Sequence, residues 1–397
     1  MTLESSTYNS TQSPSNKSMK GLSLFANIGI SEALLKDIGL SIVIANEICS
    51  NRSKIYKYIY PNTEMIEGDI TSNEVFSEIT KKSREKKIDF IIATPPCQGM
   101  STAGKQNPRD ERNNLIFFAI QAIKDIRPKY VLIENVPQQL RTKINVNGSD
   151  ITIPDYLKQS LSDNYQIEDE IINCADYGVP QMRKRSLFLL SRKGLKRKLS
   201  FLNKKEHTNH ISLADAIGDL PSLDPLIQGN SIEEQLEYFP NFQNKRTKGL
   251  SISKWHKPPK HKLRHVEIMK HTPEGKSALF NKFFYPKKPD NTRIKGYKNT
   301  YRRQLWNRPA YTITSYNGAI CSQDNVHPGR PNTINGKVQY SDARVFSLYE
   351  LMILMSIPKD WNMPDWANDS HLRHAIGEGL PPLVINKLFK KLIKSNE

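Results

Sequence analysis

The strongest constraint on the fold is the alternation of short apolar runs with helix-like segments in the first half of the chain. The apolar runs that are typical of strands occupy residues 21–29, 41–47, 89–96, 129–137 and 186–192. A largely apolar helical pattern fills 113–126, and a shorter helix is expected over 31–39, between a Ser cap and Gly39. Strands that alternate with helices are typical of βαβ units around a buried sheet. The sequence therefore predicts an α/β domain with a mostly parallel sheet.

Positive charge is concentrated further along the chain. The sequence has 58 Lys and Arg against 40 Asp and Glu, which gives a formal net charge of +18. Residues 241–310 hold 19 of the basic residues, three acids and nine aromatic residues. Basic residues interleaved with aromatic ones are typical of a surface that binds phosphates and bases. A solvated Lys-rich face is the alternative, but nearly all the net charge lies in this one segment, which favours a polyanionic partner.

Cysteine usage and the N-terminal segment indicate a reduced, soluble protein. The 397 residues include four cysteines, none in a C-x-x-C pair, which favours free intracellular thiols over a disulfide framework or a zinc ribbon. No apolar stretch approaches the ~18 residues of a membrane span. Residues 1–20 are rich in Ser, Thr and Asn and lack the apolar core of a signal peptide. We expect a disordered tail over 1–20, a cytoplasmic location and no membrane partner.

Four histidines fall in the basic segment, at positions 256, 261, 265 and 271. His261 and His265 are four residues apart, a spacing that can hold a metal on one helix face. Without nearby cysteines we do not expect a zinc site. We expect these histidines to contact phosphate or to lie on the surface.

Three features at predicted strand ends indicate a nucleoside site. The turn at 25–29 contains Gly29, Glu47 ends the second strand, and Asp69 follows the next apolar run. Ligands of open α/β sheets bind at the carboxyl ends of the strands, and an acid about 20 residues after the glycine turn commonly binds ribose hydroxyls. The turn lacks G-x-G-x-x-G, and each acid taken alone also fits a helix N-cap or an exposed loop charge. Together they favour a ligand of the adenosine type.

Cys97 follows two prolines at the end of an apolar run. Its position alone is compatible with a nucleophile or with a small buried core residue. The next predicted strand favours the nucleophile, because Glu134 lies at its end, where burial commonly raises the pKa of a carboxyl and makes it a proton donor. Gln181, Arg183 and Arg185 precede a later strand and are suited to bind a phosphate or a carbonyl oxygen.

The motifs SLFANIG, PPCQGMS, IENV and QMRKR, in this order, resemble those of the DNA (cytosine-5)-methyltransferases. LADAIGDLP (213–221) and RRQLWNRPAYTITSYNGA (302–319) resemble family segments that flank a variable target-recognition region, so the resemblance runs from about residue 21 to the C-terminus. It implies a Rossmann-like fold that uses S-adenosylmethionine as cofactor, with a smaller target-recognition domain. The implied domains are a catalytic and cofactor-binding domain (21–192) and a target-recognition domain (193–300), followed by a segment (301–397) that holds the end of the recognition domain and the C-terminal return to the catalytic domain.

The resemblance also implies roles for single residues. Cys97 would be the nucleophile, Glu134 the acid that engages N3 of the target cytosine, and Arg183 and Arg185 would help hold the flipped nucleotide, with Arg185 nearest the base. Residues 98–112 would form a mobile loop that closes over DNA. The cofactor pocket would be lined by Phe25, Ala26, Gly29, Glu47, Asp69, Ile70 and Pro96. DNA contacts would come from Gln98, Ser101, Gln181 and Thr312, and no metal is implied.

Two positions depart from the family pattern. The first motif usually reads F-A-G-x-G-G, and here Asn27 and Ile30 replace two glycines. Because Asn adopts left-handed backbone more readily than most residues, we expect the turn to be kept. The last motif usually reads G-N-x-x-x-P, and Glu378 stands where Asn is usual, at the amino-acid end of the cofactor. The segment 381–395 is expected to form an amphipathic helix that returns to the first domain.

The resulting prediction is methylation of C5 of cytosine within a specific sequence of double-stranded DNA, through a covalent bond from Cys97 to C6 and flipping of the target base. The chain would be a monomer and the modification partner of a restriction endonuclease, without a stable complex between them. A tRNA cytosine-5 methyltransferase and a catalytically weak DNA-binding relative are the alternatives.

Overall fold

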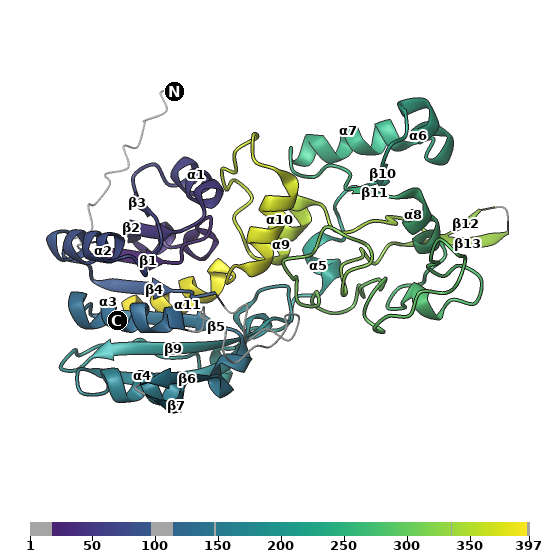
Figure 1. The fold of residues 1–397 in the computed structure, drawn as a ribbon. Helices are drawn as coiled ribbons and strands as arrows, with labels where there is room; N and C mark the ends of the chain where they lie inside the picture. The colour runs from purple at the N-terminus through teal and green to yellow at the C-terminus, as the bar shows by residue number, and fades with distance from the viewer. Residues whose placement is uncertain (1–17, 97–113, 147, 335, 395–397) are drawn as a thin grey trace, which may run out of the picture.

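The computed structural model describes residues 18–96, 114–146, 148–334 and 336–394. Two lobes lie side by side, one built on a central sheet and one with little regular structure (Figure 1). The predicted tail lies outside the described residues up to position 17. Strand β1 begins at Met19, inside the segment predicted as tail.

Seven strands form the central sheet, in the order β3-β2-β1-β4-β5-β9-β8. Their bounds are Met19–Leu24 (β1), Leu40–Glu47 (β2), Glu64–Glu67 (β3), Phe90–Ala93 (β4), Tyr130–Asn135 (β5), Tyr165–Asn173 (β8) and Lys184–Arg192 (β9). The first five strands pair in parallel, and β9 is antiparallel to both its neighbours. The predicted mostly parallel α/β sheet is confirmed.

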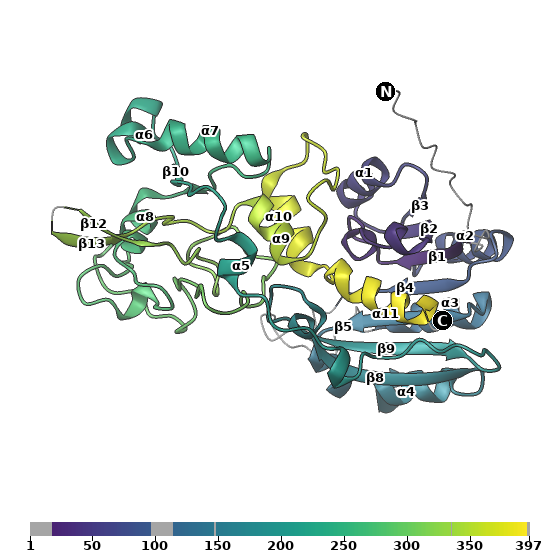
Figure 2. The same cartoon turned by 180° about the vertical axis from the view of Figure 1, so that it is seen from behind.

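Helices cover both faces of this sheet. Figure 1 shows one face with α2 (Asn73–Glu85), α3 (Leu115–Ile126) and α4 (Ile153–Leu161), and Figure 2 shows α11 (Pro382–Lys394) on the other. Strand β4 serves both layers, because Ile91 packs with the first group of helices while Phe90 and Ile92 pack with α11. The predicted C-terminal helix therefore does return to the first domain, where its apolar face completes the core.

The helix expected over 31–39 is instead two short 3-10 turns, Ile30–Glu32 and Lys36–Ile38. Gly29 and Gly39 bracket the segment with φ of 81° and 71°. Both values are left-handed, a backbone conformation that interrupts a helix, so the segment is bounded on either side.

The second lobe, residues 226–345, is held by a small apolar cluster rather than by a large sheet. Val266, Met269, Tyr301, Val326 and Val345 are among its buried members. Its elements are α6 (Ile232–Tyr238), α7 (Phe242–Ile252), α8 (Leu263–Lys270) and the strand pairs β10 (Leu226–Ile227) with β11 (Lys260–His261) and β12 (Pro331–Ile334) with β13 (Lys337–Tyr340). A further hairpin, β6 (Lys143–Val146) with β7 (Ser149–Thr152), belongs to the first lobe.

Three helices join the lobes: α5 (Leu213–Ile217), α9 (Leu348–Leu354) and α10 (Asp369–Glu378). Figure 1 shows α9 and α10 between the two lobes. At the start of α9, the fully buried Arg344 pairs with Asp342 at 2.8 Å and with Glu350 at 2.7 Å. No helix in the described part of the chain is long and apolar enough to cross a membrane.

The expectation of surface histidines is wrong for His256 and His261, which are 0% and 5% exposed. His256 bonds to the Ser347 hydroxyl and the Pro221 carbonyl, and His261 accepts a bond from the Val345 amide. Both therefore fasten the second lobe to the segment that leads into α9. Among the described residues, no group of three or more His, Cys, Asp or Glu is arranged to hold a metal ion.

Candidate active site

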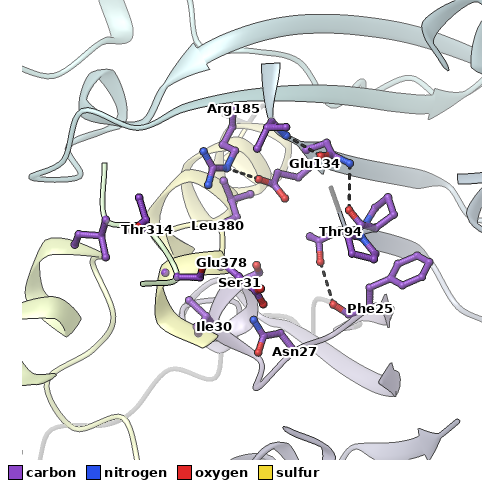
Figure 3. A pocket seen from close by; sticks show the side chains of 18 of the residues that line it. Phe25, Asn27, Ile30, Ser31, Thr94, Glu134, Arg185, Thr314, Glu378 and Leu380 are labelled. Atoms are coloured by element: carbon purple, nitrogen blue, oxygen red, sulfur yellow. Dashed lines mark hydrogen bonds and ion pairs between the residues drawn. The ribbon is translucent and has the colours of Figure 1, made fainter. Parts of the chain in front are cut away.

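A cavity of about 1280 Å³ opens where the carboxyl ends of the parallel strands face the second lobe. Its walls come from the turn after β1, the ends of β2 to β5, the start of β9, residues 311–316 and the end of α10. Strand order reverses between β1 and β4, and ligands of open α/β sheets bind at such a switch point. Phe25, from the predicted nucleoside site, and Glu134 both face this cavity (Figure 3).

The turn after β1 is kept despite its missing glycines. Phe25, Asn27 and Gly29 all have positive φ, at 59°, 52° and 81°. The backbone N–H of Asn27 donates to the Glu47 carboxylate at 2.8 Å. A Cβ added to Gly29 would lie 2.2 Å from the Tyr60 ring. Asn27 thus adopts the expected left-handed backbone. Gly29 is not among the residues that line the cavity and instead allows Tyr60 to pack against the turn.

The other predicted cofactor residues, Phe25, Ala26, Glu47, Asp69, Ile70 and Pro96, all line the cavity. Glu47 is 5% exposed and also accepts the Cys49 amide at 2.9 Å, just before α1 (Ser50–Ile59). Asp69 accepts the Thr71 amide at 2.9 Å. Each carboxylate thus orders its own loop, and its remaining lone pairs are available to hydroxyl or amine donors in the cavity.

Glu134 and Arg185 meet on the opposite wall. Arg185 Nε lies 2.7 Å from Glu134 Oε1, and the two side chains are 10% and 8% exposed (Figure 3). Because β9 is antiparallel to β5, the start of β9 lies at the edge where β5 ends. Burial raises the pKa of Glu134, although the charges of Arg185 and Arg183 act in the opposite direction. The pair therefore offers a carboxyl whose pKa is raised by burial, beside a fixed positive charge.

The strand that leads to Cys97 is anchored at the same edge. The Thr94 hydroxyl donates to the Phe25 carbonyl at 3.1 Å, and the Asn135 amide donates to the Pro95 carbonyl at 3.1 Å. Pro95 and Pro96 line the cavity directly before residue 97. Cys97, Gln98 and Ser101, and the predicted loop 98–112, lie outside the described residues.

The chain matches the C-5 cytosine-specific DNA methylase family over residues 19–394. It is 40% identical to the type II methyltransferase M1.HgaI of Avibacterium volantium over 385 residues, which cover 96% of this chain and 99% of that protein. The chain belongs to the C-5 cytosine-specific DNA methylase family. The family and the cytosine-5 methylation of DNA predicted from the sequence are thereby confirmed.

More distant proteins share the fold of this methylase. The type II methyltransferase M.DdeI of Desulfomicrobium norvegicum is 27% identical over 383 residues, which cover 94% of this chain and 88% of that protein. The solved structure of Spodoptera frugiperda DNMT2 is 18% identical and has a TM-score of 0.58, with coverage of 95% of this chain and 100% of that chain. The two lobes of this methylase thus follow a fold found well beyond its bacterial relatives.

The contacts expected of Arg183 with the nucleotide and of Gln181 with DNA stay predictions, and the structure shows what else these two side chains hold. Both are 0% exposed. The Arg183 guanidinium donates to the carbonyls of Ile313, Gly377, Glu378 and Gly379. The Gln181 amide bonds to the Leu354 carbonyl and the Ile313 amide. The two side chains thus tie the start of β9 to the elements that close the cavity, and Arg183 also lines the cavity.

Thr312 lies on the cavity wall, and its hydroxyl donates to the Met182 carbonyl at 2.7 Å. Sequence reasoning missed other wall residues, among them Asn135, Arg52 and Tyr316. Asn135 could have been found, since it is a polar residue beside Glu134 at the end of an apolar strand. Arg52 and Tyr316 gave no signal, because their place depends on how α1 and the second lobe pack.

The residues present fit S-adenosylmethionine. The cavity has acids at one end, the apolar Phe25 and Ile70, and Glu134 across from them. Asn27 Oδ1 is buried and has no hydrogen-bond partner among the described residues. An unpaired buried acceptor is costly in a folded protein, and here it lies in a side chain that lines the cavity, where a ligand donor can satisfy it.

Proposed function

We propose that this methylase modifies C5 of one cytosine within a specific sequence of double-stranded DNA, through a covalent bond between Cys97 and C6 of a flipped base. The observation that carries the proposal is the buried Glu134–Arg185 pair at 2.7 Å. Glu134 lies at the end of β5, the strand next to β4, which leads through Pro95 and Pro96 toward Cys97 in the sequence. A carboxyl and a thiol are the two groups that activation of cytosine requires.

The chemistry explains these residue types. C5 of cytosine is too poor in electrons to take a methyl group directly. The Cys97 thiolate forms a bond to C6 while N3 takes a proton from Glu134, and the ring becomes an enamine that is nucleophilic at C5. S-adenosylmethionine supplies an electrophilic methyl group on a sulfonium. Loss of the C5 proton to a base then expels the thiolate from C6 and restores the aromatic ring.

Each described residue has a part in this scheme. Burial raises the pKa of Glu134, which favours the protonated form that can donate to N3. Arg185 fixes that carboxyl and presents a charge to the carbonyl oxygen of the base. Phe25, Asp69 and Ile70 hold the adenine, and Glu47 holds the ribose. Arg183, which lines the cavity, and Gln181 hold its walls in place.

DNA enters on the side of the second lobe. A target base must leave the helix to reach a cavity of this depth, and the basic segment 241–310 supplies charge for the phosphates. Thr312 lies where the second lobe meets β9, at the cavity mouth. The 40% identity to a type II methyltransferase supports a role in protecting DNA from a cognate restriction endonuclease in the bacterial cytoplasm. The chain acts as a monomer, without a stable complex with that endonuclease.

The test is to incubate the protein with S-adenosylmethionine labelled in the methyl group and with unmethylated duplex DNA, and to map the modified positions. The expected product is 5-methylcytosine at one recurring sequence, absent with Cys97→Ala. Transfer to tRNA but not to DNA, or transfer to an exocyclic amine, would overturn the proposal.

A further inference from the structure

The turn after β1 rests on two tyrosines at the end of α1. The Tyr60 hydroxyl donates to the Gly29 carbonyl at 2.6 Å, and the Trp361 indole donates to the same hydroxyl at 3.1 Å. A Cβ added to Gly29 would meet both the Tyr60 ring and the Tyr56 ring. The residues of this turn that line the cavity are Asn27, Ile30 and Ser31 (Figure 3). The position of this wall therefore depends on the tyrosines behind it.

A carboxyl that has no part in the roles above is buried in the same place. Glu32, which is 5% exposed, ends the 3-10 turn Ile30–Glu32 and is not among the residues that line the cavity. The Tyr56 hydroxyl donates to its Oε2, whereas its Oε1 is buried and has no hydrogen-bond partner among the described residues. Acids are seldom fully buried in proteins unless a cation pairs with them.

The charged groups of the neighbouring elements do not supply that cation. Helix α11 packs against the Ile30–Glu32 turn, but its Lys391 pairs with Glu206 at 2.8 Å and its Lys387 lies beside Gly178. Exposed charged side chains of α11 and of the segment before Trp361 are Lys359, Asp360 and Lys390. The groups that face the carboxyl are the hydroxyls of Ser23, Tyr56 and Tyr60. Within the described parts of the chain, Glu32 thus has no ion pair with Lys or Arg.

Ionisation of Glu32 conflicts with this burial. The charged form loses its water and keeps one hydrogen bond, so burial raises the pKa of Glu32 to about 7, although the Ser23 and Tyr56 hydroxyls act in the opposite direction. The protonated form fits the site as it stands. The ionised form gains from any movement that carries the carboxylate toward water. Because Ser31 directly precedes Glu32, such a movement displaces the cavity wall.

We propose that Glu32 and Tyr60 are positioning residues for S-adenosylmethionine, which hold the turn that walls its cavity, and that Glu32 holds this turn more firmly when it carries its proton. The assignment rests on the proposed function. In an open turn the carboxyl has the ordinary pKa of 4.5. The preference for the ordered turn is therefore complete below this pH, declines between pH 4.5 and about 7, and is constant above. The affinity for the cofactor follows the same course.

The experiment measures the affinity of the whole protein for S-adenosylhomocysteine by calorimetric titration between pH 5 and pH 8. This nucleoside lacks the sulfonium, so direct attraction between a cofactor cation and the carboxylate does not contribute. Glu32→Gln, which cannot ionise, should bind as the unsubstituted protein does at pH 5 and about threefold or more tightly at pH 7.5. A damaged fold does not tighten binding. Glu67→Gln is the matched control, because Glu67 is exposed and pairs with Lys57 of α1 at 3.5 Å; its affinity relative to the unsubstituted protein should not change with pH.

Tyrosine variants test the contacts themselves. Tyr60→Phe keeps the ring against Gly29 and removes the hydroxyl, so the Kd for S-adenosylhomocysteine should rise about three- to tenfold while kcat at saturating cofactor is kept. Tyr58→Phe, on the same helix and 45% exposed, is the control and should change neither. Tyr56→Phe removes the donor to the ionised carboxylate, so its affinity for S-adenosylhomocysteine should continue to fall above pH 7.

Each other outcome overturns the assignment. If the affinity of Glu32→Gln relative to the unsubstituted protein is the same at pH 5 and pH 7.5, the charge of Glu32 does not act on the turn. If Glu32→Gln does not fold, an affinity of Tyr56→Phe that is constant above pH 7 leads to the same conclusion. An unchanged Kd in Tyr60→Phe would mean that its hydroxyl does not position the cofactor. Failure of the unsubstituted protein to bind S-adenosylhomocysteine would instead contradict the cofactor, and with it the proposed function.

Discussion

Arg185 contacts Glu134 at 2.7 Å because strand β9 enters the sheet antiparallel to β5. A parallel strand at this place would carry its first residues to the far edge of the sheet. One reversed strand thus brings a guanidinium to the edge where the parallel strands deliver Glu47 and Glu134.

The first prediction concerns the proton that Glu134 holds. Glu134→Gln should lower kcat by about 10²- to 10⁴-fold, the usual range for a lost general acid. It should leave the affinity for S-adenosylhomocysteine unchanged, because Glu134 lies away from the nucleoside end. Single-turnover methyl transfer and calorimetry measure the two quantities; a loss confined to binding would refute the assigned role.

The second prediction is the pH dependence of that step. Burial raises the pKa of Glu134, so its carboxyl stays protonated to higher pH than an ordinary glutamate. The rate should fall on the alkaline side as this proton is lost, at a pH above the usual carboxyl range of about 4.3. The alkaline limb of the kcat/KM profile should be absent in Glu134→Gln. If the alkaline limb is unaltered in Glu134→Gln, the loss of rate at high pH arises from another group.

The third prediction separates the two arginines. Arg183→Met leaves four carbonyls without this donor, in two buried and two part-buried hydrogen bonds, so the free energy of unfolding should fall by about 2–4 kcal/mol. Arg183→Lys should not restore it, because an ammonium cannot span the same carbonyls. Arg185→Met should lower kcat with a smaller change in stability. Chemical denaturation and turnover measure both; the reverse order would contradict the structure.

The fourth prediction concerns the turn after β1. Gly29→Ala places a Cβ 2.2 Å from the Tyr60 ring at a φ of 81°, so both overlap and backbone strain should destabilise the protein. Gly39→Ala is the control, since its φ is 71° and nothing lies within 4 Å. It should cost only the strain of left-handed backbone, about 1 kcal/mol. Equal decreases in the thermal unfolding temperature of the two variants would show that Tyr60 does not pack closely against the turn.

The fifth prediction uses His261. Burial lowers the pKa of His261 to about 3, and its Nε2 accepts the Val345 amide. An unfolded histidine titrates near 6.5, so the stability that neutral His261 provides is present above that pH and declines as the pH falls toward 3, by up to about 1.4 kcal/mol per unit. The stability difference between the unsubstituted protein and His261→Gln should narrow between pH 6.5 and 4.

The exposed His371 is the control for this series. In denaturant titrations over the same pH range, the free energy of unfolding of His371→Gln should change with pH in parallel with that of the unsubstituted protein. If the free energy of unfolding of His261→Gln also changes in parallel with that of the unsubstituted protein, folding does not shift the pKa of His261 and the prediction fails.

The sequence predicted what local pattern encodes. Strands β1, β2, β4 and β5 follow from apolar runs, and their parallel pairing places Glu134 at the same edge as Pro96. Strand β8 was not predicted, because its sequence YQIEDEIIN is rich in acids and it lies at the edge of the sheet. An edge strand faces water and does not require an apolar run.

Long-range packing was beyond the sequence patterns. Gln181 and Arg183 looked like surface ligands because polar and charged residues are seldom fully buried. Their partners, such as the Ile313 and Gly377 carbonyls, come from segments far along the chain. The buried His261 was missed for the same reason. Where the burial of a side chain is set by packing between the lobes, residue type alone predicts exposure where the structure shows burial.

The central claim, attack by Cys97 on C6 with Glu134 as acid, is tested most directly by trapping the adduct on duplex DNA in which 5-fluorocytosine replaces cytosine. Fluorine in place of the C5 hydrogen leaves no proton to remove, so the Cys97–C6 bond cannot be released after methyl transfer. The account predicts a protein–DNA complex that survives denaturing electrophoresis, requires S-adenosylmethionine, forms slowly with Glu134→Gln and is absent with Cys97→Ala. A stable complex with Cys97→Ala, or methylation of ordinary DNA by that variant, would contradict it.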